Sequence, residues 1–497
     1  MKRLISIVIA IILSCSSLIP FYAYAGVKQE SATASLLQEG NFSDGEIIAE
    51  SYQLSTVYPN LEEFKSYVYQ KLSESSSYFN IKSYGIKRSD ISIIYSNIIN
   101  DNPDLFYVSS SIKYSYNDKT NVVSSLYPNY AVEGKDLTKA RSIYQKGFNF
   151  ALGLVDDSMD DVQKALVIHD YLCLIATYPL ISNNSDDKQI FHSAYGMFYD
   201  QTVVCAGYAL AYSAILNYLG IPCKYVISDT MMHAWNIVQI NGKWYNVDLT
   251  YDDLYNTLGE NAHSMIAHSC FLKSTAAMCG NMGVWHKDII YPDGITCDDT
   301  TYDNAFWNDI NSNIPVVNGD YYYVDCNRSN LTIKLLRRDR KGNTSLVTTD
   351  NYNTGGIGRI ATNPNDSNDK HYFYIYFSPL MNYNRRLYFS YVNYKSSSNK
   401  NGVLQAINSN GTDNRMIMTL DNNNVFLALG ENKGDLLYLP RINAENADPV
   451  IADPVIKLRA SAFDEAYKNN SYNLYADANN DGVNNAKDYA LIYNNKY

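Results

Sequence analysis

A cysteine, a histidine and an aspartate occur in one segment of the chain, in a setting that could support nucleophilic catalysis. Cys205 opens the apolar run CAGYALAYSAILNYLG, His233 begins the string HAWNIVQI, and Asp248 follows KWYNV. In such a set a thiolate attacks a carbonyl carbon, an imidazole carries a proton to the leaving group, and a carboxylate orients the imidazole. The elements that carry these side chains must therefore bring them together.

The run that Cys205 opens is predicted to be a helix. Its apolar residues recur at helical spacing, and Gly220 followed by Pro222 is the usual stop signal. At a helix N-terminus the unsatisfied N–H groups and the helix dipole favour a thiolate over a thiol. Taken alone, Cys205 also fits a buried cysteine or one that is disulfide-bonded, with Cys223 as a partner.

A hairpin is predicted to carry the other two residues, because the Asn-Gly pair at 241–242 separates two strand-like runs. A two-residue loop sets Asp248 opposite Trp235 and His233 opposite Thr250. His233 and Asp248 are then diagonal neighbours on one face, with Cβ atoms roughly 7 Å apart or less. Asp248 could hold one ring nitrogen and leave the other for a thiol. Taken singly, the two residues also fit a satisfied histidine and a strand-end cap.

The strings VCAGYA, HAWNIV and NGKWYNVDLTYDD, in this order, resemble the transglutaminase-like superfamily of papain-type thiol enzymes. The resemblance covers roughly residues 160–275, with KALVIHDYL and SAYG upstream, and NDNPDLFYV resembles the N-terminal part of secreted Gram-positive members. It implies that Cys205 is the nucleophile, His233 the general base and acid, and Asp248 the orienting carboxylate. It also implies an α+β fold with a papain/transglutaminase-like core, in which the Cys205 helix packs on an antiparallel sheet.

The sequence departs from two better-known branches of this superfamily. The calcium-dependent animal enzymes carry further domains that are not recognisable here, so their crosslinking activity does not transfer automatically. The glycan-removing amidases carry zinc-binding CxxC pairs, and this chain has none. Tyr195 and the backbone N–H of Cys205 are weak candidates for stabilising an oxyanion, and Tyr195 fits core packing better.

The remaining histidines and cysteines favour structural roles. His169 lies on an apolar helical face and is predicted to be a packed core residue. A second group could suggest a metal, but its spacings match no zinc template, and a disulfide among its cysteines is favoured. Its members are Cys270, Cys279, Cys297, His263, His268 and His286. Seven cysteines remain without Cys15, so at least one free thiol is expected, and no organic cofactor is predicted.

Near the C-terminus, oxygen-bearing residues occur at the spacing of a calcium loop, with Gly482 at the sharp turn. The predicted ligands are Asp477, Asn479, Asp481, the carbonyl of Val483, Asn485 and Asp488. The plainer alternative is an Asn/Asp-rich turn without metal. The ending resembles one dockerin repeat, which implies a cohesin partner on a scaffold or cell surface. Dockerins usually carry two loops, and here one is found, with Asn484 at a position that is usually aliphatic.

The first 25 residues match a secretory signal. Lys2 and Arg3 precede an apolar run, and Ala23-Tyr24-Ala25 offers small residues at the positions that signal peptidase recognises. The alternative is a lipoprotein box that ends at Cys15. Later segments do not approach 18 consecutive apolar residues, so no transmembrane span is predicted. The expected location is secreted or extracellular, with cell-surface attachment as a further option.

Composition excludes some classes of protein. With 497 residues, 46% hydrophobic and 18% charged, the chain is predicted to be globular with several domains. The net charge is −11 without a long basic run, so nucleic acid is not the expected partner. The predicted segments are a signal peptide at 1–25, a linker at 26–45, an N-terminal α/β region at 46–135, a catalytic domain at 136–300, a β-rich, propeller-like fragment at 301–448 and a dockerin-like segment at 456–497.

These features predict a secreted thiol enzyme that acts on amide or peptide carbonyls through a thioester at Cys205. Its substrate is expected to be a protein or peptide. Water as acceptor would make a peptidase or amidase, and an amine would make a protein crosslinker; hydrolysis is slightly favoured because water is abundant. The alternative is an inactive surface attachment protein that uses the β-rich region and the calcium loop.

Overall fold

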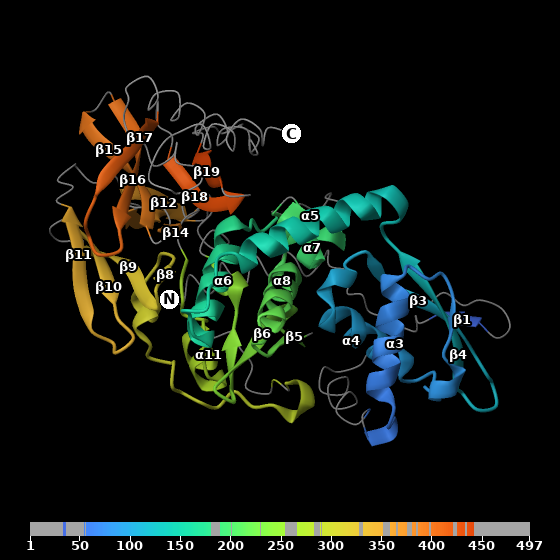
Figure 1. Cartoon of the computed structure of the whole chain (residues 1–497). Coiled ribbons are helices and arrows are strands. Elements are labelled where there is room, and N and C mark those ends of the chain that lie inside the picture. Colours follow the sequence, from blue (N-terminus) through green and yellow to red (C-terminus); the bar gives the residue numbers. More distant parts are fainter. Residues whose placement is uncertain are drawn as a thin grey trace. The chain divides into compact units, whose positions relative to one another are not determined.

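The computed structural model describes a large part of the chain as two compact units. The described residues up to Asn311 form the first unit, and those from Ser312 form the second (Figure 1). The described residues are 33–35, 54, 56–179, 189–199, 201–228, 230–253, 266–282, 289, 291–327, 332–350, 358–363, 366–374, 380–383, 386–396, 399–420, 425–432 and 435–441.

The first unit begins with helices packed on an antiparallel sheet whose strand order is β1-β3-β4-β2. The elements are β1 (Thr33–Ser35), α3 (Leu61–Ser73), β2 (Phe79–Asn80), η1 (Lys82–Tyr84), α4 (Ile91–Asp101), η2 (Pro103–Leu105), β3 (Val108–Tyr116) and β4 (Val123–Tyr130). β1 pairs with β3, although its residues fall in the predicted linker, because edge pairing requires only backbone groups that sequence composition does not reveal.

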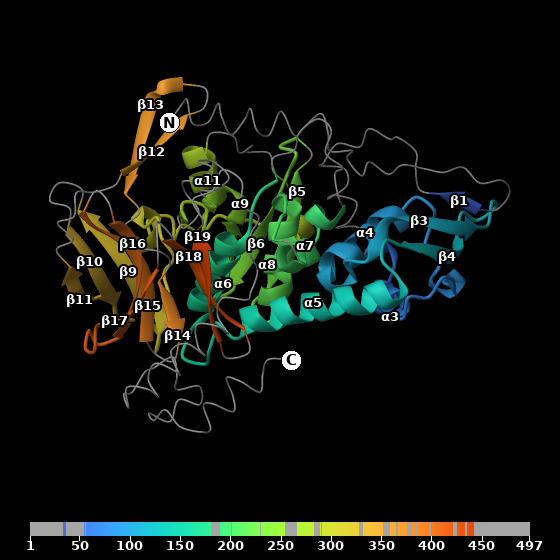
Figure 2. The same ribbon diagram turned by 90° about the horizontal axis from the view of Figure 1, so that it is seen from above.

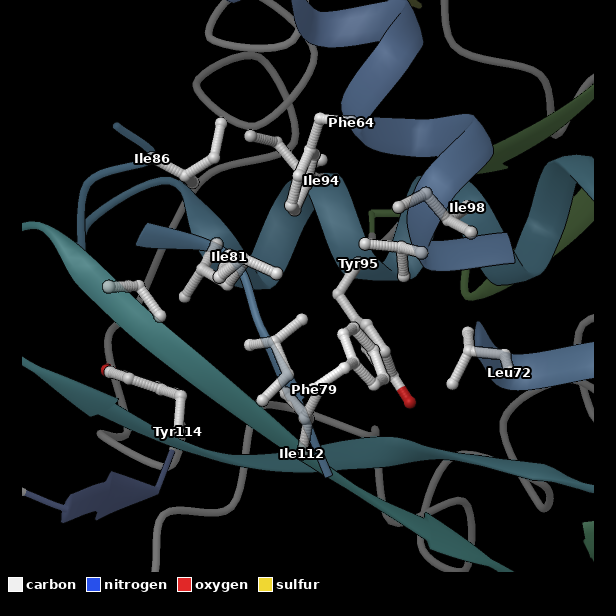
Figure 3. Close-up of a cluster of buried hydrophobic side chains, with 14 of the residues drawn as sticks. Phe64, Leu72, Phe79, Ile81, Ile86, Ile94, Tyr95, Ile98, Ile112 and Tyr114 are labelled. Atoms are coloured by element: carbon white, nitrogen blue, oxygen red, sulfur yellow. The ribbon is translucent and has the colours of Figure 1, made fainter. Parts of the chain in front are cut away.

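The core of this region lies between α4 and the sheet. Ile94, Tyr95 and Ile98 recur along one face of α4 and are each 1% exposed. Figure 3 shows these residues in one cluster with Ile112 and Tyr114 of β3. Burying one such isoleucine stabilises the fold by about 1.5–3 kcal/mol before entropy is counted, so the apolar spacing accounts for the helix and its orientation.

Helices dominate the next part of the first unit, and the predicted helix that begins at Cys205 is one of them. They are α5 (Gly134–Leu152), α6 (Asp161–Ile175), η3 (Gln189–His192), α7 (Ala194–Tyr199) and α8 (Cys205–Tyr218). The start of α6 is fixed by a capping box, in which the Asp160 carboxylate accepts the N–H of Gln163 and the Gln163 side chain accepts the N–H of Asp160. The Tyr212 hydroxyl of α8 donates to the carbonyl of Ala165 in α6 at 3.0 Å, so these two helices are joined.

A three-stranded antiparallel sheet, in the order β5-β6-β7, completes the part of the first unit that matters for chemistry. Its strands are β5 (Cys223–Ser228), β6 (His233–Ile240) and β7 (Lys243–Val247), followed by α9 (Leu249–Asp252), α11 (Thr275–Met282), η5 (Pro292–Gly294) and η6 (Phe306–Asp309). In both views α8 lies beside β5 and β6, with α6 next to it (Figures 1 and 2).

The first unit extends past residue 300, where the sequence analysis ended the catalytic domain. Lys273 is fully buried, and its ammonium donates to the carbonyls of Tyr302 and Asp303 and to the amide oxygen of Asn308. A buried ammonium needs such partners, so residues 301–311 remain with this unit. Composition alone does not reveal this dependence.

The described elements of the second unit are strands. They are β8 (Val316–Val317), β9 (Asp320–Asn327), β10 (Thr332–Arg338), β11 (Thr344–Asp350), β12 (Gly358–Asn363), β13 (Asp366–Tyr374), β14 (Met381–Tyr383), β15 (Arg386–Ser396), β16 (Asn399–Asn408), β17 (Arg415–Leu420), β18 (Val425–Asn432) and β19 (Asp435–Arg441). Two four-stranded antiparallel sheets, β8 to β11 and β14 to β17, share a core that includes Leu335 and Ile407. A propeller-like arrangement stays a prediction.

Among the described residues, no helix is both long and apolar enough to cross a membrane.

Candidate active site

Cys205 is the first residue of α8, at the helix end where the dipole is positive. The N-cap residue is Val204, whose backbone is extended and whose side chain forms no capping hydrogen bond. The side chain of the N-cap residue therefore accepts no hydrogen bond from the N–H groups of the first turn. Cys205 is 9% exposed, and its sulfur is a free thiol.

A glycine permits the close approach that places the start of α8. A Cβ atom on Gly207 would lie 2.7 Å from the carbonyl oxygen of Phe191 and 2.7 Å from Val203. The same carbonyl accepts the N–H of Val204 at 3.0 Å. Only glycine fits this contact without a shift of the backbone, so Gly207 helps to fix where the Cys205 thiol lies.

The predicted hairpin is present from its turn back to Asn236. Ile240 pairs with Lys243, and the turn residues 241 and 242 both have positive φ, as a two-residue hairpin of this type requires. Asn236 pairs with Val247 at the far end of this ladder. The register deduced from the Asn-Gly pair is therefore correct over this range.

The extension of this register to residue 250 is wrong. β7 ends at Val247, and the chain turns into α9, with Asp248 as the N-cap of that helix. Asp248 Oδ1 accepts the N–H of Tyr251 at 3.2 Å, and its own N–H donates to the carbonyl of Cys270 at 3.1 Å. These capping bonds compete with strand pairing, so Asp248 does not pair with Trp235.

His233 and Asp248 nevertheless meet at the end of the sheet. His233 Nε2 lies 2.7 Å from Asp248 Oδ2, so one carboxylate oxygen caps α9 and the other holds the imidazole. The other ring nitrogen, Nδ1, remains for Cys205, whose side chain also hydrogen-bonds His233. The structure thus brings together the three residues that the sequence analysis selected.

The charge of His233 follows from these contacts. Burial of the ring opposes protonation, but the charge of Asp248, its hydrogen bond and the hydrogen bond with Cys205 outweigh burial and raise the pKa of His233 to about 10. The imidazole is therefore a cation at neutral pH. A cationic imidazole beside a cysteine can give a proton to a leaving group.

Aromatic rings set the orientation of the His233 ring. Trp235 stacks on it with ring centroids 6.0 Å apart and an interplanar angle of 13°, and Tyr251 meets it edge-on at 5.0 Å. The Trp235 indole N–H donates to Asn246 Oδ1 at 3.1 Å, which holds the stacking ring in turn. The tryptophan and asparagine of the hairpin strings thus have a direct role in placing the imidazole.

Tyr195 belongs to an aromatic stack. Its ring stacks on Phe106 with centroids 4.6 Å apart and on Tyr199 with centroids 5.1 Å apart. These contacts agree with the expected core packing and lend no support to a role in binding an oxyanion.

Tyr225 is a residue near the site that the sequence analysis did not select. It lies on β5 opposite Asn236, and its pKa is raised by burial and, to a smaller extent, by the charge of Cys205. The sequence could have indicated Tyr225 only by its position in the strand that follows α8. Many packed tyrosines occupy such positions, so this signal is weak.

Neither the alternative disulfide between Cys205 and Cys223 nor the favoured one in the second cysteine group is formed. Cys205 and Cys223 are free thiols, and so are Cys270 and Cys297. A disulfide among Cys270, Cys279 and Cys297 needs at least one of the two that are free, so that expectation is wrong. The side chain of Cys279 lies outside the described residues, as do His263 and His286.

His169 is buried and packs against Phe271, as expected, but its ring nitrogens face carboxylates. The ring lies between the carboxylates of Asp170 and Asp252, at 2.9 Å and 3.2 Å, and burial of the ring is outweighed by their hydrogen bonds and charges, which raise its pKa to about 9. His268 lies 3.0 Å from the same Asp170 oxygen. The sequence analysis predicted simple packing from the apolar helical face. It missed the polar contacts because Asp252 and His268 are distant from His169 in sequence.

Two predictions fall where the structure gives no description. The signal segment at 1–25 and the calcium loop from Asp477 to Asp488 lie outside the described residues. Both stay predictions.

Comparison with known proteins finds a family match in the central part of the chain. Residues 149–249 match the family model of the Transglutaminase-like superfamily. No curated protein matches the sequence. A solved structure titled "Crystal structure of a TGase" is similar at 15% identity with a TM-score of 0.20, covering 26% of this chain and 41% of that chain. The chain thus spans less than half the length of that structure. The family model thus covers the segment that includes Cys205, His233 and Asp248.

Proposed function

We propose that the protein is a thiol enzyme that attacks amide or peptide carbonyls through Cys205. The observation that carries this proposal is the buried contact between His233 and Asp248, at 2.7 Å, on a ring that also hydrogen-bonds Cys205. A structural histidine needs only satisfied nitrogens. A cationic ring between a carboxylate and a helix-start thiol supports nucleophilic catalysis.

Each of the three side chains has one task in the proposed reaction. The Cys205 thiolate attacks the carbonyl carbon, and the N–H groups at the start of α8 face the developing oxyanion. The His233 imidazolium gives its proton to the leaving amine, so a thioester forms at the sulfur and the amine departs. An incoming nucleophile then loses its proton to His233, the acyl group leaves, and the thiolate is restored. Asp248 keeps the imidazole in one orientation throughout.

We propose hydrolysis as the main outcome, with a protein or peptide as substrate, because water reaches a thioester unless the site excludes it. Transfer to an amine, which would crosslink proteins, is the second outcome of the same thioester. Digestion of a peptide library, with and without a dansylated amine, separates the two. New free carboxyl termini or released ammonia indicate hydrolysis, and incorporation of the fluorophore indicates transfer.

Alkylation by iodoacetamide at about pH 6 tests the nucleophile directly. Cys205 should react much faster than Cys223, which is a free thiol whose pKa is raised by burial. The Cys205→Ala variant should lose activity and keep its circular dichroism spectrum, whereas Cys223→Ala is the matched control and should stay active. Equal labelling of both thiols, or full activity of Cys205→Ala, would favour the inactive attachment protein instead.

We also propose that the chain is exported through residues 1–25 and binds calcium at the loop from Asp477 to Asp488, which would attach it to a cohesin-type partner or cell surface. The oxygen spacing of the loop supports the calcium proposal. Calorimetry should show calcium binding that Asp477→Ala weakens. Unchanged binding by that variant would contradict it, and N-terminal sequencing of exported protein would locate the cleavage site.

A further inference from the structure

A second cluster of titratable side chains lies next to the proposed catalytic residues. His169 and Asp170 are on α6, Asp252 ends α9, and His268 lies in the segment before α11. All four are buried, with exposures between 0% and 3%. The proposed reaction does not use any of them.

Both ring nitrogens of each histidine face an acceptor. His169 Nδ1 lies 2.9 Å from Asp170 Oδ1, and its Nε2 lies 3.2 Å from Asp252 Oδ2, an ion-pair contact with poor hydrogen-bond alignment. His268 Nδ1 lies 2.8 Å from the carbonyl oxygen of Ile310, and its Nε2 lies 3.0 Å from the same Asp170 oxygen. A neutral ring has only one N–H, so a cationic His169 ring best satisfies its two contacts.

The electrostatics of the cluster agree with this assignment. Burial opposes a charge on His169, but the hydrogen bonds and charges of Asp170 and Asp252 raise its pKa to about 9. Burial likewise opposes a charge on Asp170, but the two imidazoles lower its pKa. The buried His169 cation is then compensated by the carboxylates of Asp170 and Asp252. Lys273 is the further charged group that acts on Asp252.

A bound metal ion is the competing explanation. One ligand atom from each of His169, Asp170 and His268 lies within 4.8 Å of the others. Charge compensation between the rings and the carboxylates already accounts for every one of these short contacts, so the observations favour a hydrogen-bonded network.

The network reaches Asp248 through two backbone groups. Asp252 Oδ1 accepts the N–H of Cys270 at 3.0 Å and the hydroxyl of Ser269 at 3.1 Å. The carbonyl of Cys270 accepts the N–H of Asp248 at 3.1 Å, and the N–H of Asp252 donates to the carbonyl of Asp248 at 3.2 Å. The carboxylate that His169 holds therefore anchors both ends of α9.

We propose that His169 is a positioning residue that, as an imidazolium between Asp170 and Asp252, fixes α9 so that the Asp248 carboxylate stays on His233. This inference rests on the proposed function of Cys205, His233 and Asp248. It assigns His169 no contact with the substrate. Loss of its charge should move Asp248 away from the His233 ring and so weaken the imidazolium.

The unmodified protein gives the first test, through nitrogen NMR of histidine labelled with ¹⁵N. At pH 7 both nitrogens of His169 should show the shifts of an imidazolium. A neutral His169 ring would overturn the proposal, and so would about one metal ion per chain that a chelator removes together with a change at this ring.

The second test compares His169→Gln with Leu166→Ala, a matched substitution of a buried residue on α6 outside the network. His169→Gln should lower the pKa of His233 by about one unit and slow alkylation of Cys205 at pH 6 roughly tenfold to a hundredfold. Leu166→Ala should change neither value. If His169→Gln fails to fold, Ser269→Ala, which removes one donor to Asp252, should cause a smaller shift in the same direction.

Neither readout depends on knowing the substrate. The pKa of His233 and the alkylation rate of Cys205 could both stay unchanged in a folded His169→Gln variant. That result would overturn the positioning role and leave the proposed function intact. A wild-type Cys205 that does not react faster than Cys223 would instead contradict the proposed function.

Discussion

At the scale of single residues, the chemistry depends on the way Asp248 divides its two oxygens. Oδ1 caps α9 and Oδ2 holds His233, so one side chain couples the local fold to the charge of the imidazole. A neutral side chain of the same shape could still accept the capping N–H, because asparagine is also a good N-cap. It could not supply the charge that keeps the ring protonated.

We therefore expect Asp248→Asn to fold and to lose most activity. The pKa of His233 should fall from about 10 toward its ordinary value near 6.5, and kcat/KM should fall by a factor on the order of 10²–10⁴. The measurements are the pH dependence of Cys205 alkylation and of kcat/KM. Asp299→Asn, which removes an aspartate bound to the Tyr245 hydroxyl, is the control and should leave both unchanged. A wild-type pH profile in Asp248→Asn would show that the carboxylate does not act on the ring.

At the scale of elements, α6, α8, α9 and β6 carry the buried side chains of the proposed site and of the network beside it. α8 brings the thiol, β6 brings His233, and α9 turns Asp248 toward that ring. Asn236 joins β6 to α8 through a hydrogen bond of 3.0 Å from its Nδ2 to the carbonyl of Ala209. α6 contributes the cation that compensates the carboxylate at the end of α9. Buried charges on several elements make the folded state sensitive to pH.

We expect the free energy of unfolding to fall as pH rises from about 6.5 to about 8.5. His169 binds its proton more tightly when folded, with a pKa of about 9, than when unfolded near 6.5. Its stabilising contribution is therefore complete below pH 6.5 and is lost as pH rises toward the folded value, by roughly 2 kcal/mol over this window. In the proposed ion pair Cys205 gives up one proton as His233 gains one, so that pair adds little to the slope.

Urea denaturation at a series of pH values measures this slope. The window stays below the ordinary pKa values of cysteine and tyrosine, so that ionisation of these groups in the unfolded chain contributes little. His169→Gln should remove most of this slope, and Leu166→Ala should lower stability equally at every pH. A flat or rising profile in the wild type would contradict the charged state of His169.

At the scale of the whole molecule, the chain divides after Asn311, and the proposed site lies entirely within the first unit. Residues 301–311 supply the carbonyl partners of Lys273 and the carbonyl of Ile310 that accepts His268 Nδ1. The stability of the site should therefore depend on where a shortened chain ends.

A chain that ends at residue 311 should keep the fast alkylation of Cys205, whereas one that ends at residue 300 should lose it. The shorter chain leaves the Lys273 ammonium and one nitrogen of His268 buried without partners, at a cost of about 1–3 kcal/mol or more for each group. Circular dichroism and alkylation rates on both chains, beside the full-length protein, check this. Equal behaviour of the two truncations would show that residues 301–311 are dispensable.

The sequence by itself determined the features that depend on neighbouring residues. Apolar spacing and a Gly-Pro stop place α8 with Cys205 at its start, and the Asn-Gly pair sets the register of β6 and β7. These signals are local because helix and turn conformations follow from the side chains within a few positions. The choice of Cys205, His233 and Asp248 followed from these elements and from the family resemblance.

Only the tertiary structure decided the contacts between distant segments. Asp248 leaves the strand because Cys270 offers its N–H an acceptor, and His169 is charged because Asp252 folds against α6 beside Asp170. The free energy of a buried charge depends on which groups surround it in space, and spacing along the chain does not report that. The same helical face that predicts a packed histidine thus carries an ion network.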